Sequence, residues 1–146
     1  MAESPAVEQV AARRAYFNLQ IAAQRTRVRA DELFAAAAGL TTAQAAALTL
    51  IAHDPGCTQR ALATALRQRE SAITAMVGRL VEAGLVERRV SESDRRSWQL
   101  WPTDAGQKAL AGTGPAITQL NRRIAAALEG ADLDTVLDAL EALGQV

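Results

Sequence analysis

The sequence of 146 residues has few cysteines, histidines and aromatic residues, and its formal net charge is zero. A single cysteine, Cys57, excludes an intramolecular disulfide, so nothing in the chain requires an oxidising compartment. A single histidine, His53, and the lack of a cysteine cluster argue against a bound metal ion. Aromatic residues make up only 3% of the chain, so its core must consist mainly of Ala, Leu, Val and Ile.

Long apolar runs are also missing. No run approaches the roughly 18 residues that span a bilayer, and residues 1–14 lack the apolar segment of a secretory signal. We therefore expect a cytoplasmic protein that does not contact membranes. The sequence shows no nucleophile–base pair, phosphate-binding glycine loop or paired carboxylates, so we expect neither an enzyme nor a cofactor.

The zero net charge conceals an uneven distribution of charge. Residues 55–101 contain eight arginines and five acidic residues, an excess of three positive charges, whereas residues 102–146 contain three basic and six acidic residues. Four of these arginines lie within residues 86–100, "VERRVSESDRRSWQL". Such an excess is often only a solvated face, so charge alone does not predict a nucleic-acid partner.

The alanine-rich runs and the apolar periodicity predict a mainly helical chain. The expected helices cover residues 5–38, 43–53, 59–66, 70–84, 104 to about 128, with a bend at 113–115, and 132–143. Two short stretches with strand character, 85–90 and 97–101, flank a polar turn and predict a β-hairpin. Pro102 is expected to end the second strand, and Thr103 to cap the helix that follows.

This order of helices followed by a hairpin is typical of a winged helix-turn-helix. In that fold the second helix of the motif enters the major groove of DNA, and the hairpin, or wing, reaches the adjacent minor groove. We therefore expect a single domain over residues 1–146, mainly α with a small β-hairpin wing. Its DNA-binding lobe would cover residues 41–103, between terminal helices at 1–40 and 104–146.

Residues 58–108 resemble the DNA-binding core of the MarR family of winged-helix regulators. The similarity rests on "LA" at 62–63, "SAITAMVGRLVEAGLVERR" at 71–89, "DRR" at 94–96 and "TDAG" at 103–106. It implies a homodimer that is held together by the terminal helices and binds a pseudo-palindromic operator in double-stranded DNA, more often as a repressor than as an activator.

The resemblance also implies which side chains contact DNA. These are Thr58, Arg67, Arg69, Glu70, Ser71, Thr74, Ala75, Arg79, Arg95 and Arg96. Asp94 would orient a wing arginine for the minor groove; we favour Arg96 for that role and Arg95 for a phosphate, although the two could be exchanged. The alternative for the wing is surface ion pairing, because Arg88 and Arg89 adjoin Glu87 and Arg95 adjoins Asp94 in the sequence.

MarR-like proteins often bind a small phenolic or aromatic acid between the terminal helices and the lobe. The candidate residues for such a pocket are Arg13, Tyr16, Phe17, His53 and Arg60. The aromatic residues could equally belong to the core. For Cys57 we favour a structural role over a redox role. Trp98 and Trp101 are three residues apart on one strand and should point to opposite faces of it.

A second hypothesis is a helical interaction protein that keeps the winged-helix scaffold without binding specific DNA. In such a protein Arg95 and Arg96 would be dispensable, and binding would depend on salt but not on base sequence.

Overall fold

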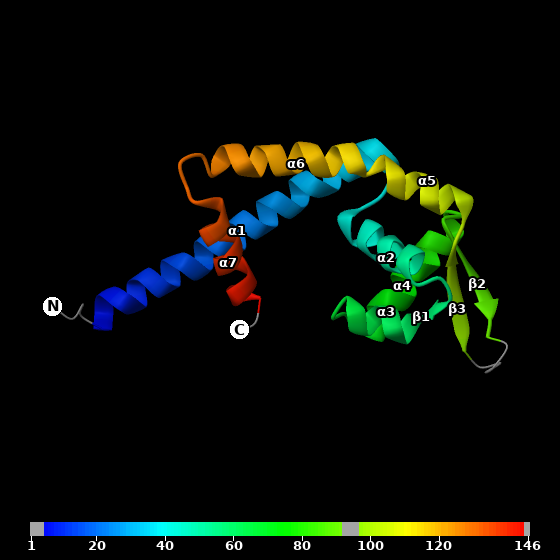
Figure 1. Cartoon of the computed structure of the whole chain (residues 1–146). Coiled ribbons are helices and arrows are strands. Elements are labelled where there is room, and N and C mark those ends of the chain that lie inside the picture. The colour runs from blue at the N-terminus through cyan, green and yellow to red at the C-terminus, as the bar shows by residue number, and fades with distance from the viewer. Residues whose placement is uncertain (1–4, 92–96, 145–146) are drawn as a thin grey trace.

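The computed structural model describes the backbone of residues 5–91 and 97–144, and the side chains from Arg14 onward within these ranges except that of Leu133. The helices are α1 (Pro5–Ala38), α2 (Thr42–His53), α3 (Gln59–Ala65), α4 (Glu70–Glu82), α5 (Asp104–Gly112), α6 (Gly114–Ala127) and α7 (Leu133–Leu143). The strands are β1 (Cys57–Thr58), β2 (Val86–Val90) and β3 (Trp98–Pro102). Figure 1 shows the lobe of α2–α4 and the strands at one end of the long helices α1 and α6.

The predicted fold class and most predicted helices are confirmed, with two differences. The short strand β1 was not expected. The helix predicted from residue 104 onward is divided at Thr113 into α5 and α6, where a bend was expected. Pro102 ends the second strand as predicted, since it is the last residue of β3, where it lies opposite Val86. A proline is tolerated there because it is a terminal residue of its strand.

The joint between α1 and α2 is built from side-chain caps. Thr41 Oγ1 accepts a hydrogen bond from the Gln44 amide at 3.1 Å, and Gln44 Oε1 accepts one from the Thr41 amide at 2.9 Å, which forms a capping box. Asp31 of α1 accepts hydrogen bonds from the hydroxyl and the amide of Thr42, at 2.6 and 2.8 Å. These bonds hold the pKa of the Asp31 carboxyl below its usual value.

The core of the lobe is built from short aliphatic side chains, as the scarcity of aromatic residues predicts. Leu48 and Ile51 of α2 pack with Ile73 and Leu80 of α4. The nine largest side chains that are fully buried are Leu40, Leu48, Ile51, Leu62, Ile73, Leu80, Leu100, Val77 and Val86. Leu100 belongs to β3, so the sheet closes the same core that the helices form.

The three strands form one antiparallel sheet in the order β1-β3-β2. Cys57 lies opposite Leu100 in the β1–β3 pair, and the Gly56 amide donates to the Leu100 carbonyl at 2.7 Å. Gly56 has a φ of +93°, and a Cβ there would approach the Trp101 ring to 3.1 Å, so this position requires glycine. Strand β1 thus ties the start of α3 to the wing.

The "TDAG" motif fastens α5 to the start of the wing. Thr103 Oγ1 donates to the Gly84 carbonyl at 2.6 Å and accepts from the Gly106 amide at 3.0 Å, and the Thr103 amide donates to the Leu85 carbonyl. A Cβ on Gly106 would lie 2.1 Å from the Leu85 carbonyl oxygen. The glycine of this motif is therefore needed for the close approach of α5 to residues 84–85.

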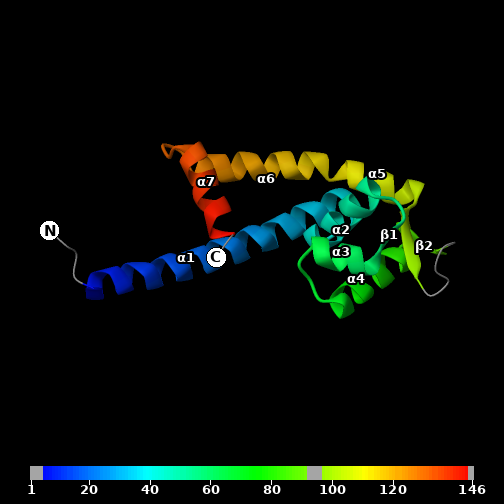
Figure 2. The same cartoon turned by 60° about the horizontal axis from the view of Figure 1, so that its bottom comes forward.

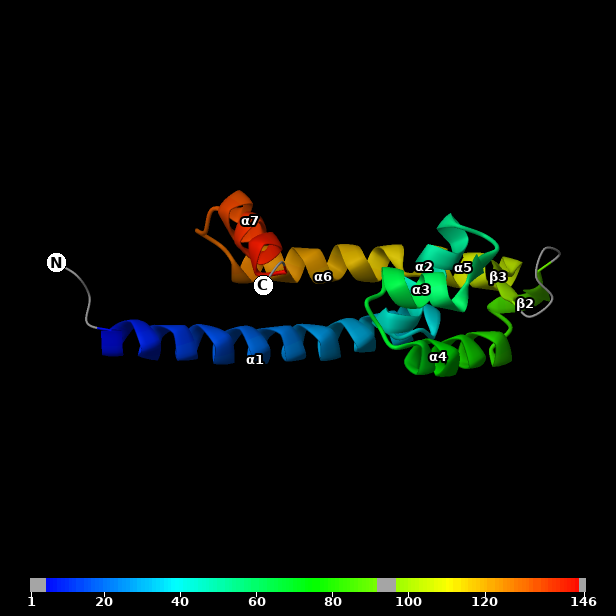
Figure 3. The same cartoon turned by 90° about the horizontal axis from the view of Figure 1, so that it is seen from below.

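The terminal helices extend away from the lobe with much of their apolar surface uncovered. Helices α1 and α6 lie side by side near the lobe and then diverge (Figure 1). Helix α7 turns back from the end of α6 (Figure 2) and lies apart from α1 when the molecule is seen from below (Figure 3). Their exposed apolar side chains are Tyr16, Phe17, Leu19, Ile21 and Val28 of α1, Ile117 and Ile124 of α6, and Leu137, Leu140 and Leu143 of α7.

Candidate nucleic-acid interface

Helix α4 separates its buried and exposed residues cleanly. Ile73, Val77 and Leu80 face the core and are 0% exposed. The predicted DNA-contact residues of this helix and its N-terminal flank are all exposed: Arg69, Glu70, Ser71, Thr74, Ala75 and Arg79. The apolar spacing of the sequence predicts this division, because residues three and four apart share a face of a helix. One whole face of α4 is therefore free to meet a ligand.

The turn between α3 and α4 carries two exposed arginines, Arg67 and Arg69. Arg67 has a φ of +51°, the left-handed conformation that favours glycine. Its amide donates to the Thr64 carbonyl at 3.1 Å, and the Gln68 amide donates to the Ala63 carbonyl at 3.0 Å. Arg69 occupies the N-cap position of α4 without a side-chain capping bond, so its guanidinium is not needed to start the helix.

Helices α3 and α4 are joined by two polar contacts on their exposed side. Thr74 Oγ1 donates to Gln59 Oε1 at 3.0 Å, and Arg60 Nε lies 3.9 Å from Glu70 Oε1. The Arg60–Glu70 pair is well exposed, so it contributes little to stability. Gln59 was not among the predicted site residues, and no local pattern could have indicated it, because its partner is fifteen residues away.

The start of α3 and the wing border an open groove of about 230 Å³. Its lining residues are Thr58, Gln59, Arg60, Ser97 and Trp98. The hydroxyl of Thr58, a predicted DNA contact, accepts from the Ala61 amide at 3.1 Å and caps α3. Trp98 is 51% exposed at the edge of this groove.

One arginine of the wing, Arg89, contacts other residues of the wing. Arg89 forms an ion pair with Glu87, and its guanidinium lies 4.6 Å from the centre of the Trp101 ring. For Arg89, the structure therefore shows the surface ion pair with Glu87 that was the alternative to DNA contact. Arg88 Nε is buried without a hydrogen-bond partner among the described atoms. The two tryptophans lie on opposite faces of β3, as predicted, because they are three residues apart.

The wing tip, which includes Asp94, Arg95 and Arg96, lies outside the described residues. The predicted roles of these three side chains in the minor groove therefore remain predictions.

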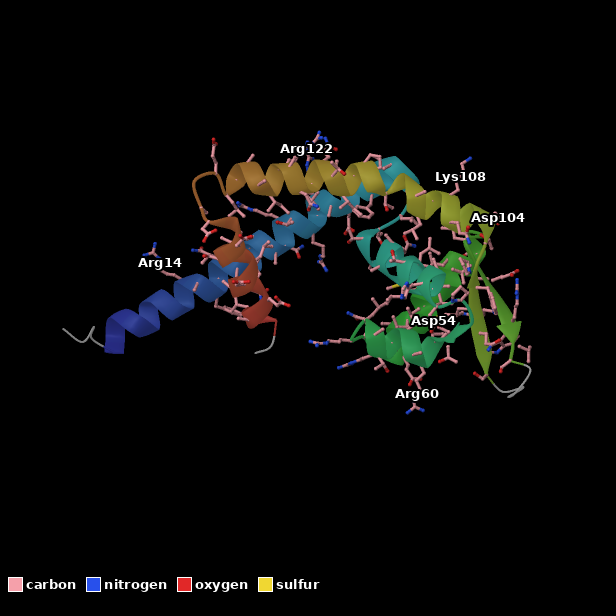
Figure 4. The ribbon with its side chains drawn as sticks, viewed as in Figure 1. Arg14, Asp54, Arg60, Asp104, Lys108 and Arg122 are labelled. Atoms are coloured by element: carbon pink, nitrogen blue, oxygen red, sulfur yellow. The ribbon has the colours of Figure 1, made fainter. Side chains whose placement is uncertain are left out.

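The candidate pocket residues do not come together within one chain. Tyr16 and Phe17 stack edge to face on the far half of α1, with ring centres 5.8 Å apart, and each is about 60% exposed. Figure 4 shows Arg14, two residues before Tyr16, far from Arg60, which points away from the lobe on α3. His53 lies at the end of α2, and the Arg13 side chain is outside the described residues.

His53 and Cys57 line a small apolar pocket of about 90 Å³ between α2 and α3. Burial and the neighbouring Asp54 carboxylate raise the pKa of the Cys57 thiol above its usual value. A raised pKa leaves less of the reactive thiolate at neutral pH, which favours the structural role of this cysteine.

Two further observations concern metal binding and membrane insertion. Among the described residues, no three His, Cys, Asp or Glu side chains are grouped as a metal site would require. Over the same residues, no single helix is both long enough and apolar enough to cross a membrane. Residues 14–38 and 42–53, two helices that meet at a bend, reach that length and apolar content only when they are taken together.

Comparisons with known proteins agree with this geometry. The family model described as "MarR family" matches residues 38–97. A putative transcriptional regulatory protein for the hcr operon of Thauera aromatica is 35% identical over 105 residues, which cover 72% of this chain but only 63% of that protein. The transcriptional regulator HosA of Escherichia coli O111:H- is 32% identical over 91 residues, which cover 62% of this chain and 67% of HosA.

A solved structure extends the similarity over most of the chain. The transcriptional repressor CouR, bound to a 23-mer DNA duplex, is 32% identical, with a TM-score of 0.71 over 86% of this chain and 92% of CouR. The matched lobe contains the exposed face of α4 and the sheet described above. Together, the family model, the related regulators and the shared fold show that the chain belongs to the MarR family of transcriptional regulators.

Proposed function

We propose that this protein is a transcriptional regulator that binds a pseudo-palindromic DNA operator as a homodimer. The observation that carries the proposal is the exposed face of α4, which presents Arg69, Ser71, Thr74 and Arg79 beside the wing while its opposite face is fully buried. A helix held in this way can enter the major groove, which is wide enough for an α-helix. Enzymatic activity is not expected, in agreement with the family.

Charge on the same side of the lobe supports binding to phosphates. Arg67, Arg69 and Arg79 are exposed and form no ion pair with another described residue. Unpaired guanidinium groups around a groove-binding helix attract the DNA backbone and release its counterions. The DNA duplex in the CouR structure gives independent support, because CouR shares this fold.

The exposed apolar side chains of α1, α6 and α7 support a second copy of the chain as partner. Ten large apolar side chains on these helices are 37–62% exposed, a surface that a stable monomer would cover. Two lobes held by such an interface would place two α4 helices on one side of a duplex, about one helical turn apart. A two-fold symmetric dimer then requires a pseudo-palindromic site.

Release from DNA by a small aromatic ligand is a further part of this proposal, together with a repressor role. Because Tyr16 and Phe17 lie far from His53 and Arg60 within one chain, a pocket that includes them all would need residues of the second chain. The PcaV regulator of Streptomyces coelicolor, whose structure holds its natural ligand, shares the fold. A ligand would act by changing the distance between the two α4 helices.

Fluorescence anisotropy on DNA from the upstream region of the protein's own gene tests the proposal. The wild type should bind this duplex more tightly than a scrambled one, and its affinity should fall steeply with salt. Arg69→Ala should weaken binding by about 1–3 kcal/mol, because it removes a guanidinium without removing a cap. Arg96→Ala tests the wing in the same way.

Arg122→Ala is the matched control, since Arg122 is exposed on α6 and points away from the lobe (Figure 4). Its removal should leave DNA affinity unchanged. Equal binding of both duplexes, unaffected by Arg69→Ala and Arg96→Ala, would contradict the proposal and favour an interaction protein that does not recognise DNA sequence.

A further inference from the structure

The side chain of Thr74 lies on the exposed face of α4, but its hydroxyl is engaged within the protein. Oγ1 lies 3.0 Å from Gln59 Oε1 on α3 and 2.9 Å from the Glu70 carbonyl one turn earlier in α4. A hydroxyl has one hydrogen to donate, and here two acceptors already share it. The donor of Thr74 is therefore occupied before any DNA base approaches.

This bonding decides which part of Thr74 faces outward. In a helix, threonine has two favoured rotamers, because its hydroxyl can bond to the carbonyl of an earlier turn. The acceptor on Gln59 adds a second constraint, which keeps Oγ1 turned toward α3. Thr74 and the neighbouring Ala75 are both exposed residues, so with the Thr74 hydroxyl bonded within the protein, their methyl groups are the parts left to make an apolar contact.

We propose that Thr74 recognises DNA through its methyl group and thereby selects thymine, with Gln59 as the positioning residue that keeps the methyl group outward. The inference rests on the proposed function, since it requires α4 to enter the major groove. There the C5-methyl group distinguishes thymine from the other bases, and alanine or threonine methyl groups make the apolar contact that recognises it.

The test replaces thymine by uracil, which lacks only the C5-methyl group. The probe is an upstream duplex that the full-length wild type binds selectively, with each thymine of a half-site replaced in turn, symmetrically in both half-sites. At one position we expect the affinity for DNA to fall by about fourfold per half-site, or roughly 15-fold for the dimer, because each half-site loses the burial of one methyl group. Anisotropy titrations at a fixed salt concentration measure it.

Three variants separate the roles of the methyl group, the hydroxyl and Gln59. Thr74→Ser keeps the hydroxyl but loses the methyl group, so the preference for thymine over uracil should disappear. Thr74→Val keeps a methyl group without the hydroxyl, so the preference should remain. Gln59→Met removes the acceptor on α3 at similar length, so the preference should shrink although Thr74 itself is unchanged.

Thermal unfolding of each variant confirms that it is folded, and Arg122→Ala again provides the control for surface substitution. Selective binding by the wild type with no uracil effect at any position would overturn the thymine proposal and leave the proposed function intact. The same uracil penalty in Thr74→Ser as in the wild type would also overturn it. Equal binding of the upstream duplex and a scrambled duplex by the wild type would instead contradict the proposed function.

Discussion

The winged-helix lobe and the terminal helices bury their apolar residues to very different extents. In the lobe, Leu48, Ile51 and Leu100 are 0% exposed, because α2, α4 and the sheet enclose them. On α7, Leu137 and Leu140 remain about half exposed, although their spacing along the helix is equally regular. The lobe therefore completes its core with its own residues, whereas the terminal helices leave apolar surface uncovered, which the proposed dimer would bury.

The largest expected effect is at Gly106, where α5 packs against the lobe. Gly106→Ala places a Cβ 2.1 Å from the Leu85 carbonyl oxygen, so the backbone of α5 or of residues 84–85 must move. We expect the free energy of unfolding to fall by about 3 kcal/mol, as for severe overpacking. Urea denaturation followed by circular dichroism measures it.

Gly78 provides the matched control for this substitution. A Cβ on Gly78 would have no neighbouring atom within 4 Å, so Gly78→Ala adds the same methyl group without a clash. Because alanine is the better helix former, this variant should gain up to about 1 kcal/mol. Equal stabilities of the two variants would show that α5 does not need the close approach to residue 85.

The second expected effect concerns the terminal helices, at Leu140. About half of this side chain remains to be covered, so its burial is worth about 1 kcal/mol per chain. Leu140→Gln should therefore weaken a two-chain assembly by roughly 30-fold without unfolding the lobe. Sedimentation or light scattering, referred to the chain mass of 15.5 kDa, measures the dissociation.

Glu141→Gln introduces the same side chain at the next position, which is exposed and polar, and should leave assembly unchanged. If Leu140→Gln associates as tightly as Glu141→Gln, the exposed face of α7 does not take part in the interface.

The smallest expected effect lies at the joint between the two regions. Asp31 of α1 accepts two hydrogen bonds from Thr42 of α2, and its pKa is lowered by them. A lowered pKa in the folded state means stabilisation that is present above the ordinary carboxyl pKa and is lost as the pH falls through the folded value. Asp31→Asn should therefore cost about 1 kcal/mol at pH 7 and progressively less below about pH 4.

Urea denaturation of both proteins at pH 7 and at pH 3 checks this dependence on pH. Glu32→Gln is the control, because Glu32 is exposed and pairs only with Arg29 of its own helix among the described contacts. A difference between wild type and Asp31→Asn that stays constant from pH 7 to pH 3 would rule out a role for the carboxylate charge.

Most of the fold could be predicted because it depends on local patterns. Apolar spacing along 70–84 and turn residues such as Gly84 act within one helix or one turn, and the structure follows them closely. Strand β1 could not be predicted in this way, since its two residues pair with β3 about forty residues later in the chain. The kink at Thr113 was indicated, but not the complete break into two helices.

The candidate DNA-binding site could also be predicted only where it depends on local patterns. The exposed residues of α4 follow from helical periodicity and from the family motif. Gln59 was missed because its role depends on a contact between two helices. The candidate pocket follows from the resemblance to the family, and the sequence does not indicate that one chain holds α1 near Arg14 apart from Arg60 of α3 (Figure 4).

Strand β1 has a consequence for the length of DNA that one subunit covers. It joins the start of α3 to the wing through β3, and α3 is in turn bonded to the groove-binding helix α4 through Gln59 and Thr74. Helices α3 and α4 and the base of the wing are therefore linked by contacts beyond the chain itself. Under the proposed function, the number of base pairs between the major-groove and wing contacts of one half-site should then be constant, and only the spacer between half-sites should respond to a movement of the terminal helices. Insertions within a half-site and insertions in the central spacer are therefore different kinds of operator mutation.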